Sequence, residues 1–267
     1  MLPNSDLDLL DFIQNQTSSN HIILIDPDAQ SSSEAAERCV AAIIAGTRMI
    51  FVGGSTGTDK NNVDETIIYI QNAIKKEKNN SFLANSKLWD VPVVLFPACA
   101  NAFSSSADGI TFMMLMNSTS TKFLIEEQLI GAPAIKSANV TPISMGYIVC
   151  EPGGKVGEVG EAKLIKSDEI DLISSYAICA ESYGFSLLYL EAGSGANNPV
   201  SPELIKAARE SCNLTIIVGG GIRDGSTAKL AIDAGADWIV TGNLCEEFAD
   251  AHELQATLQT FIAEMNS

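Results

Sequence analysis

The sequence has few basic residues for its length, and this shortage excludes one class of partner. Of 267 residues, 16 are Lys or Arg and 33 are Asp or Glu, which gives a formal net charge of −17. A general nucleic-acid binder normally carries a basic patch or stripe that neutralises phosphates. The composition therefore argues against nucleic acid as a partner. Any anionic ligand must be held locally by backbone amides, a few basic side chains or a divalent cation.

Cysteine pairs and cysteine–histidine clusters are also lacking. The six cysteines are scattered, with no CxxC pair and no close histidine: Cys39, Cys99, Cys150, Cys179, Cys212 and Cys245. This spacing indicates neither a zinc site nor a disulfide framework. Small, buried, apolar side chains are the favoured interpretation.

Long apolar segments and flexible linkers are absent as well. Residues 1–20 lack the basic start and apolar core of a signal peptide, and no apolar run reaches the roughly 20 residues of a membrane span. We therefore expect a soluble, cytoplasmic protein. No segment rich in Pro, Gly or Ser divides the chain, which predicts a single domain over residues 1–267.

Short β-rich runs alternate with amphipathic or alanine-rich stretches along the whole chain. Most of the runs show little polar alternation, which is typical of parallel strands covered on both faces. The predicted strands are 22–25, 49–52, 91–95, 111–115, 144–149, 186–190, 215–218 and 238–240. The predicted helices are 33–45, 63–78, 121–130, 168–183, 202–209 and 226–234. Eight such repeats predict an α/β fold, a (β/α)₈ TIM barrel.

The third repeat fits this pattern poorly. Residues 96–109, between two predicted strands, are too few and too irregular for an ordinary crossover helix. We therefore expect a modified barrel at this point.

Three glycine-bearing turns follow the last three predicted strands. They read YLEAGSG over residues 189–195, VGGGI over 218–222 and TGN over 241–243. Glycine permits positive φ and a close approach of the backbone, so several amides can point at one anion. The turns after the last strands of a parallel barrel commonly bind phosphate. Together the three turns predict a phosphate site.

Oxygen-bearing side chains follow the first two predicted strands. Asp26 begins the sequence Asp-Pro-Asp, and Ser55 ends the sequence Gly-Gly-Ser. Consecutive strands are neighbours in a barrel, and magnesium commonly joins one or two carboxylates to substrate phosphates. Asp26 and Ser55 are therefore candidate magnesium ligands. The Asp-Pro-Asp segment is equally compatible with a turn that caps the next helix.

Glu191 is the candidate catalytic residue. Tyr189 and Glu191 flank Leu190 on one strand, so both point to the same side, toward the barrel mouth. A carboxylate beside a phosphate site can act as a general base for a substrate hydroxyl. It can also serve only as a hydrogen-bond partner of the ligand or of a backbone amide. Both interpretations place Glu191 in the site.

These motifs, in this order, carry a family resemblance that covers essentially the whole chain. The chain resembles the geranylgeranylglyceryl phosphate synthases of archaea and their bacterial heptaprenylglyceryl phosphate relatives. The segments that carry the resemblance are LIDPD (24–28), VGGS (52–55), LFP (95–97), YLEAGSG (189–195), VGGGI (218–222) and TGN (241–243).

The resemblance implies a prenyltransferase of ether-lipid biosynthesis. The implied reaction joins geranylgeranyl diphosphate to the 3-hydroxyl of sn-glycerol 1-phosphate and releases diphosphate, the first committed step toward archaeal membrane lipids. Asp26 and Ser55 would bind Mg²⁺, and Glu191 would take the hydroxyl proton. The residues implied in glycerol phosphate binding are Tyr189, Leu190, Glu191, Ala192, Gly193, Ser194, Gly195, Gly220, Gly221, Gly242 and Asn243. A homo-oligomer and transient contact with a membrane, the source of the prenyl substrate, are also implied.

One departure from the family pattern concerns the diphosphate. Many relatives have a basic residue directly after Asp-Pro-Asp, whereas this chain has Ala29 and Gln30. Lys60 and Arg223 are the candidate substitutes. For the prenyl tail, the methionine-rich segment 112–116 and the small residues Ala98, Ala100 and Ala102 form a candidate groove wall, although such strands are more often core.

Other functions remain open at this point. The same glycine turns occur in other phosphate-binding barrels, such as phosphosugar isomerases and thiamine phosphate synthase-like enzymes, and a non-enzymatic phosphate-binding protein is a third possibility. The Asp-Pro-Asp and Tyr-Leu-Glu segments favour the prenyltransferase. The length of the prenyl chain depends on the depth of the groove, and the sequence leaves it open.

Overall fold

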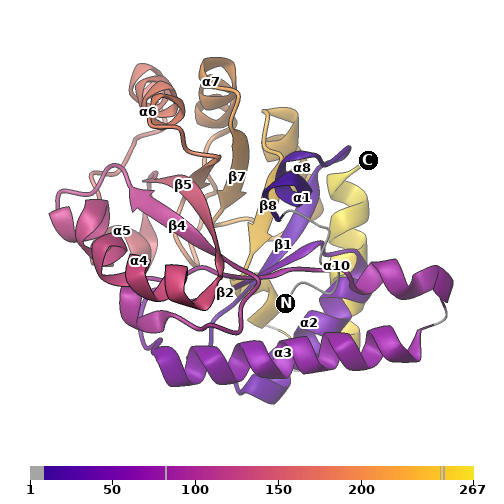
Figure 1. Ribbon diagram of the computed structural model, residues 1–267. Coiled ribbons are helices and arrows are strands. Elements are labelled where there is room, and N and C mark those ends of the chain that lie inside the picture. Colours follow the sequence, from indigo (N-terminus) through magenta and orange to yellow (C-terminus); the bar gives the residue numbers. More distant parts are fainter. Residues whose placement is uncertain (1–8, 82, 247, 249) are drawn as a thin grey trace.

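The structure, a computed structural model, describes residues 9–267 except 82, 247 and 249 (Figure 1). Residues 1–8, which form part of the segment used to argue against a signal peptide, lie outside the described residues. Within the described residues, no helix is both long enough and apolar enough to cross a membrane.

The described residues form a closed barrel of eight parallel strands in sequence order. Pairing of Asn20 with Trp238 and of Ile23 with Thr241 joins the last strand to the first and closes the ring. Each predicted strand is present, so the expected barrel is confirmed. The strands are β1 (Asn20–Ile25), β2 (Met49–Val52), β3 (Val93–Leu95), β4 (Gly109–Leu115), β5 (Thr141–Val149), β6 (Leu187–Glu191), β7 (Thr215–Gly219) and β8 (Trp238–Thr241).

Helices surround the strands (Figure 1). The α-helices are α1 (Leu9–Gln14), α2 (Ser32–Ala45), α3 (Lys60–Asn80), α4 (Glu127–Ala138), α5 (Gly154–Val159), α6 (Ile170–Ser182), α7 (Pro202–Ser211), α8 (Gly225–Asp233), α9 (Asn243–Glu246) and α10 (Ala251–Met265). The other helical segments are η1 (Leu83–Trp89) and η2 (Ala100–Ala102), both 3₁₀, and η3 (Lys122–Glu126), a π-helical turn that leads into α4.

The third repeat departs from the regular barrel as expected. β3 is followed by the three residues of η2, and no α-helix lies between β3 and β4 in this fully described segment. The η2 turn packs against α3 and α4. The short connection therefore lies between the long helices α3 and α4.

Local sequence signals fix the position of α2, and through it the turn that carries Asp26. The Ser31 side chain accepts a hydrogen bond from the Glu34 amide while the Glu34 side chain accepts one from the Ser31 amide, a capping box. The helix ends at Gly46, whose φ of 116° suits glycine. The residues between β1 and this cap are thereby held as a tight turn at the barrel mouth.

Two apolar layers hold the barrel together. One fills its interior and includes Phe51, Tyr147, Tyr189 and Trp238, and the other lies between the strands and the helices. His21 is buried between the hydroxyls of Thr47 and Thr241, at 2.8 Å from each. Burial lowers the pKa of His21 to about 3, so this histidine is a neutral structural residue.

Candidate active site

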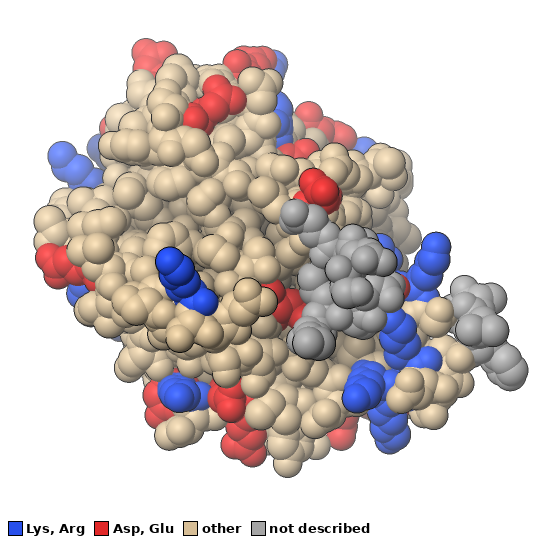
Figure 2. Space-filling view, in the orientation of Figure 1, with Lys and Arg blue, Asp and Glu red and all other residues tan. Residues whose placement is uncertain are grey.

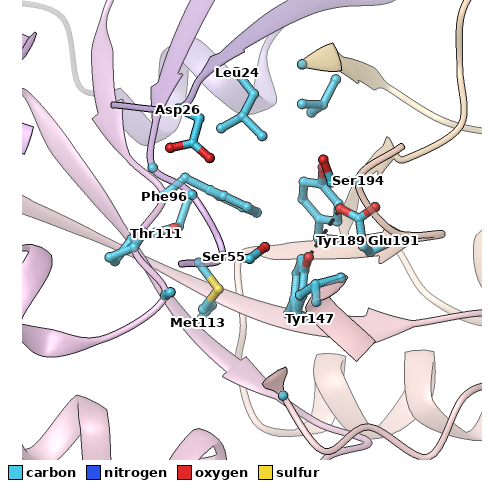
Figure 3. Close-up of a pocket in the computed structure, with 18 of the residues that line it drawn as sticks. Leu24, Asp26, Ser55, Phe96, Thr111, Met113, Tyr147, Tyr189, Glu191 and Ser194 are labelled. Carbon is cyan, nitrogen blue, oxygen red and sulfur yellow. Dashed lines mark hydrogen bonds between the residues drawn. The ribbon is translucent and has the colours of Figure 1, made fainter. Parts of the chain in front are cut away.

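A cavity of about 310 Å³ opens at the carboxyl ends of the strands. It is lined by residues from the turns after β1, β2, β6, β7 and β8, and it continues between β4, η2 and α4. Figure 3 shows Glu191 and Ser194 on one side of this cavity and Asp26 on the other. The predicted metal ligands, base and phosphate turns therefore share one cavity.

Asp26 is half-buried in the turn after β1. Its Oδ1 accepts a hydrogen bond of 2.9 Å from the Asp28 amide, as the turn interpretation expects. Burial raises the pKa of Asp26, the Asp28 amide lowers it, and the charge of Asp28 raises it. A Cβ on Gly54 would lie 2.3 Å from Asp26 Oδ2, so the glycine in the turn after β2 allows the carboxylate to lie against it. Asp26 is thus both a turn residue and a cavity residue.

The residues around Asp26 fit a magnesium ion that is shared with a substrate. Within the described residues, no three His, Cys, Asp or Glu side chains are grouped closely enough to hold a metal by themselves. Asp26 and Ser55 nevertheless line the same cavity, and Glu246 adds a second carboxylate there. Burial and the charge of Asp26 raise the pKa of Glu246. Since Mg²⁺ usually keeps only one or two protein carboxylates and completes its shell with phosphate and water, this donor set is suitable.

Glu191 lies at the end of β6 and is 7% exposed. Its Oε1 accepts a hydrogen bond of 2.6 Å from the Gly193 amide, and its Oε2 accepts one of 3.2 Å from the Tyr147 hydroxyl. Burial raises the pKa of Glu191, and the hydrogen bonds from Gly193, Tyr147 and Tyr189 oppose that rise. A Cβ on Gly220 would lie 2.3 Å from Oε1, so glycine leaves room for this carboxylate. Glu191 is held firmly, with a pKa that favours proton uptake.

Two of the three glycine turns, those after β6 and β7, adopt the positive φ that lets backbone amides turn toward an anion. Positive φ values occur at Gly193 (106°), Gly195 (70°), Gly220 (84°) and Gly221 (72°). The Ser194 hydroxyl donates to Asn243 Oδ1 at 2.8 Å and joins the first turn to the third. Backbone amides at such positions can converge on one anion.

The predicted phosphate residues differ in how they meet the cavity. Its lining includes Tyr189, Glu191, Ser194, Gly195, Gly220, Gly221, Gly242 and Asn243. Leu190 and Ala192 instead pack in the layer between strands and helices, and the Ala192 amide and carbonyl are already hydrogen-bonded to Gly219 and Gly153. The amide of Gly193 is already used by Glu191.

The aromatic rings of Phe96, Tyr147 and Tyr189 line the cavity. Phe96 stacks on Phe51 with ring centres 5.1 Å apart, and Tyr147 lies 5.0 Å from Tyr189. Phe96 also contacts both tyrosines, at 5.3 and 5.8 Å between ring centres. The alternation of Met145, Tyr147 and Val149 on β5 was the available signal that Tyr147 points inward.

The structure separates the two candidate cations for the diphosphate. Arg223 lines the main cavity. Lys60 instead begins α3 and borders a separate surface hollow with Asn61 and Asp64. Of the two candidates, Arg223 is therefore the one that shares a cavity with Asp26 and Ser55. Lys155 also lines the cavity, although no sequence motif singled it out.

The apolar end of the cavity agrees in part with the expected groove. Phe112, Met113, Ala98 and Ala100 line it, together with Phe123 and Ile135. Ala102 is buried in the outer core, and Met116 packs against that core. Phe112 and Met113 are adjacent in β4, so residues from both faces of this strand contribute to the groove.

A parallel barrel that combines glycine turns, a buried carboxylate and an apolar extension in one cavity defines a phosphate-binding (β/α)₈-barrel enzyme. The PcrB family model matches residues 12–262. The chain belongs to the PcrB family.

Curated relatives and a solved structure agree with this membership. The chain is 42% identical to the geranylgeranylglyceryl phosphate synthase of Methanococcoides burtonii over 91% of this chain and 93% of the relative. It is 44% identical to that of Methanosarcina acetivorans over 89% and 91%. The crystal structure of (S)-3-O-geranylgeranylglyceryl phosphate synthase from Thermoplasma acidophilum, in complex with its substrate sn-glycerol-1-phosphate, is 34% identical. The structural match covers 97% of this chain and 99% of the crystallised chain, with a TM-score of 0.87.

Proposed function

We propose that this protein is a prenyltransferase that joins geranylgeranyl diphosphate to the 3-hydroxyl of sn-glycerol 1-phosphate and releases diphosphate. One observation carries the proposal: a single cavity unites the glycine turns, Glu191, the Asp26–Ser55 pair and an apolar extension. Relatives with this printed activity match nearly the whole chain. The proposal assigns one substrate to each end of the cavity.

The acceptor binds at the glycine turns. The amides of Gly195, Gly220, Gly221 and Gly242 hold the phosphate, and the Ser194 hydroxyl and Asn243 side chain add polar contacts. A short glycerol chain anchored there brings its terminal hydroxyl toward Glu191. Two firmly placed hydrogen bonds orient the Glu191 carboxylate, which takes the hydroxyl proton.

The donor binds across the cavity from Glu191. Asp26 and Ser55 would hold Mg²⁺ together with the diphosphate, and the ion would neutralise charge on that leaving group. Arg223 and Lys155 line the same cavity and supply further positive charge. The prenyl chain lies along Phe112, Met113 and Phe123, where apolar side chains remove it from water.

The reaction exchanges one carbon–oxygen bond for another. The allylic C–O bond breaks, and its electron pair leaves with diphosphate. A lone pair of the glycerol hydroxyl forms the ether bond to the same carbon, and the proton passes to a Glu191 oxygen. Positive charge that develops on the allyl group faces the rings of Phe96, Tyr147 and Tyr189, whose π-faces favour cations.

A direct assay tests the proposal. Purified protein is incubated with Mg²⁺, sn-glycerol 1-phosphate and prenyl diphosphates of several lengths, and the ether product is sought by mass spectrometry. We expect geranylgeranylglyceryl phosphate. The sn-glycerol 3-phosphate enantiomer is the matched control acceptor. A folded protein that forms no ether with any donor would rule out the function.

We also propose that the protein is a homo-oligomer. Leu129 and Ile130 on α4 are 65% and 67% exposed, and Ile178 and Tyr183 at α6 are exposed as well. Large apolar side chains of this kind are enriched where protein surfaces meet. Light scattering after size exclusion should give a multiple of the 28.3 kDa chain mass. A monomer at micromolar concentration would contradict this.

We place the protein in the cytoplasm. All six cysteines are free thiols in the structure, which suits a reducing compartment. Transient membrane contact would supply the prenyl donor. Fractionation of the source cells should find the protein outside the membrane pellet after a salt wash.

A further inference from the structure

The apolar end of the cavity lies along the contact between η2 and α4, which we call the joint. On one side is η2, the short turn that replaces the helix of the third repeat, and on the other is α4. A full crossover helix would pack along its length, whereas η2 offers only three residues. The spacing between η2 and α4 therefore depends on a few specific contacts.

Glu127, at the start of α4, makes the polar contact across this joint. Its Oε2 accepts a hydrogen bond of 2.7 Å from the Ala100 amide, and its Oε1 lies 3.7 Å from Lys122 Nζ. Its side chain is 18% exposed and lines the cavity. Among the described residues, this is the one hydrogen bond that joins η2 to α4. A carboxylate in an apolar wall is costly unless it is partnered, and the Ala100 amide is a donor that a short 3₁₀ turn leaves without a helical acceptor.

The neighbouring Gln128 forms hydrogen bonds that hold α4 to the barrel and not to η2. Gln128 Nε2 donates to the carbonyl of Met113 on β4 and, at 3.3 Å, to that of Phe123. Across the joint, a Cβ on Gly131 would lie 3.6 Å from the Ala100 Cβ, an ordinary contact distance. Gly131 therefore has no side chain that could keep η2 and α4 at a fixed distance.

We propose that Glu127 is a positioning residue that fixes η2 against α4 and thereby sets which prenyl chain lengths the cavity accepts. This inference rests on the proposed function. Glu127 acts on the donor through the Ala100 amide and takes no part in proton transfer.

The test compares Glu127→Ala with Glu126→Ala. Glu126 is the adjacent, exposed carboxylate, which accepts a hydrogen bond from the Thr121 hydroxyl at 2.7 Å and not from η2. Steady-state kinetics are measured with farnesyl, geranylgeranyl and heptaprenyl diphosphates. Loss of a charge-assisted hydrogen bond to the half-buried Ala100 amide should raise the KM for geranylgeranyl diphosphate about tenfold. The KM for sn-glycerol 1-phosphate should stay within about twofold, because the partners of Glu127 are Ala100 and Lys122 and not the glycine turns. The kcat/KM ratios among the three donors should move toward one.

Two further variants separate the hydrogen bond from general damage. Glu127→Gln keeps an oxygen acceptor and should restore most of the donor preference. Glu127→Asp has a carboxylate one methylene shorter and should behave like Glu127→Ala, and it replaces that variant if Glu127→Ala does not fold. Hydrogen exchange of a peptide that covers residues 96–104 should be faster in Glu127→Ala and Glu127→Asp than in the wild type.

The outcomes are distinct. Unchanged donor preference in a folded Glu127→Ala or Glu127→Asp protein, or unchanged exchange at residues 96–104, overturns the inference while the proposed function stands. An equal change in Glu126→Ala also overturns it. A wild-type protein that forms no ether with any donor overturns the function and this inference together.

Discussion

At the scale of single residues, the site depends on carboxylates whose surroundings set their chemistry. Glu191 is enclosed by aromatic rings and a backbone amide, whereas Asp26 is half-buried beside a second aspartate. Burial raises the pKa of both. The first is suited to accept a proton and the second to share a cation.

Glu191→Gln should slow ether formation by at least about 100-fold, a typical loss for a general base. The amide side chain has nearly the same size and keeps an oxygen for the Gly193 amide. Glycerol phosphate should therefore still bind, which calorimetry would measure. An unchanged turnover rate would mean that Glu191 is only a contact residue.

The pH profile should report the same carboxylate. Glu191 acts as a base only when ionised, and burial holds its pKa above the usual range of a glutamate. Activity should therefore rise with pH through this raised pKa and fall as pH drops below it. The loss of activity at low pH should be absent from the residual activity of Glu191→Gln. If that variant still loses activity at low pH, the titrating group is not Glu191.

Asp26→Asn should weaken the response to magnesium without unfolding the protein. Asparagine keeps an oxygen that can accept from the Asp28 amide, so the turn after β1 survives, but the charge is lost. The Mg²⁺ concentration for half-maximal activity should rise about tenfold or more. The melting temperature is the control, and an unaltered Mg²⁺ titration would remove Asp26 from the metal site.

Gly220→Ala should disrupt the site through a steric clash with Glu191. The added Cβ would lie 2.3 Å from Glu191 Oε1 and 2.6 Å from the Gly193 amide nitrogen, at a φ of 84°. Gly184→Ala is the matched control, because φ there is 78° but nothing lies within 4 Å of the added Cβ. Both should lose about 1 kcal/mol of stability from backbone strain, and Gly220→Ala should lose more because its Cβ also meets backbone atoms of Ala192 and Gly193. Only Gly220→Ala should lose activity, as kinetics and urea unfolding together would reveal.

At the scale of elements, the strands were predictable because burial on both faces leaves a clear apolar run. The modified third repeat was also correctly predicted, from the small and irregular composition of residues 96–109. The helix α10 was missed, although Leu254, Leu258, Phe261 and Met265 recur at helical spacing and Asp250 caps its first turn. That signal was present in the sequence.

The parts of the site that could not be predicted depend on contacts between distant segments. Asp26, Ser55 and the glycine turns follow strand ends, so the barrel rule brings them together. Three features depend on side-chain directions and loop paths. They are the position of Lys60 outside the main cavity, the hydrogen bond from the Gly193 amide to Glu191, and the hydrogen bond from the Ala100 amide to Glu127. No periodic pattern encodes these.

Helix α10 should be essential for stability. α10 packs on α2 and α8, and its Phe261 is buried with its ring 5.5 Å from that of His21. Phe261→Ala should cost about 3 kcal/mol or more in the free energy of unfolding. Thr260→Ala, a change at the exposed neighbouring position, should cost far less. Equal urea midpoints for the two variants would contradict this packing argument.

At the scale of the whole molecule, charge affects how anionic substrates arrive. The net charge is −17, and Figure 2 shows acidic and basic side chains scattered over one face without a basic stripe. Both proposed substrates are anions, so the overall field repels them. Local amides and cations must act at short range, where screening is weaker.

Moderate salt should therefore raise the kcat/KM for the prenyl diphosphate. Screening to about 0.15 M ionic strength reduces the repulsion between the protein and the donor. We expect an increase of about twofold at constant free Mg²⁺, measured against sodium chloride. A steep fall would instead show that attraction by Arg223 and Lys155 dominates association.

Closure of the ring by β1 and β8 has a consequence for biosynthesis of the protein. This pairing joins residues 20–23 to residues 238–241, so the turns that carry Asp26 and Asn243 become neighbours only when the last strand is in place. During translation, Asp26 leaves the ribosome long before Asn243 is made. On the proposed function, the growing chain therefore lacks one of its two anion sites, and glycerol phosphate should bind only after β8 has been released and has docked.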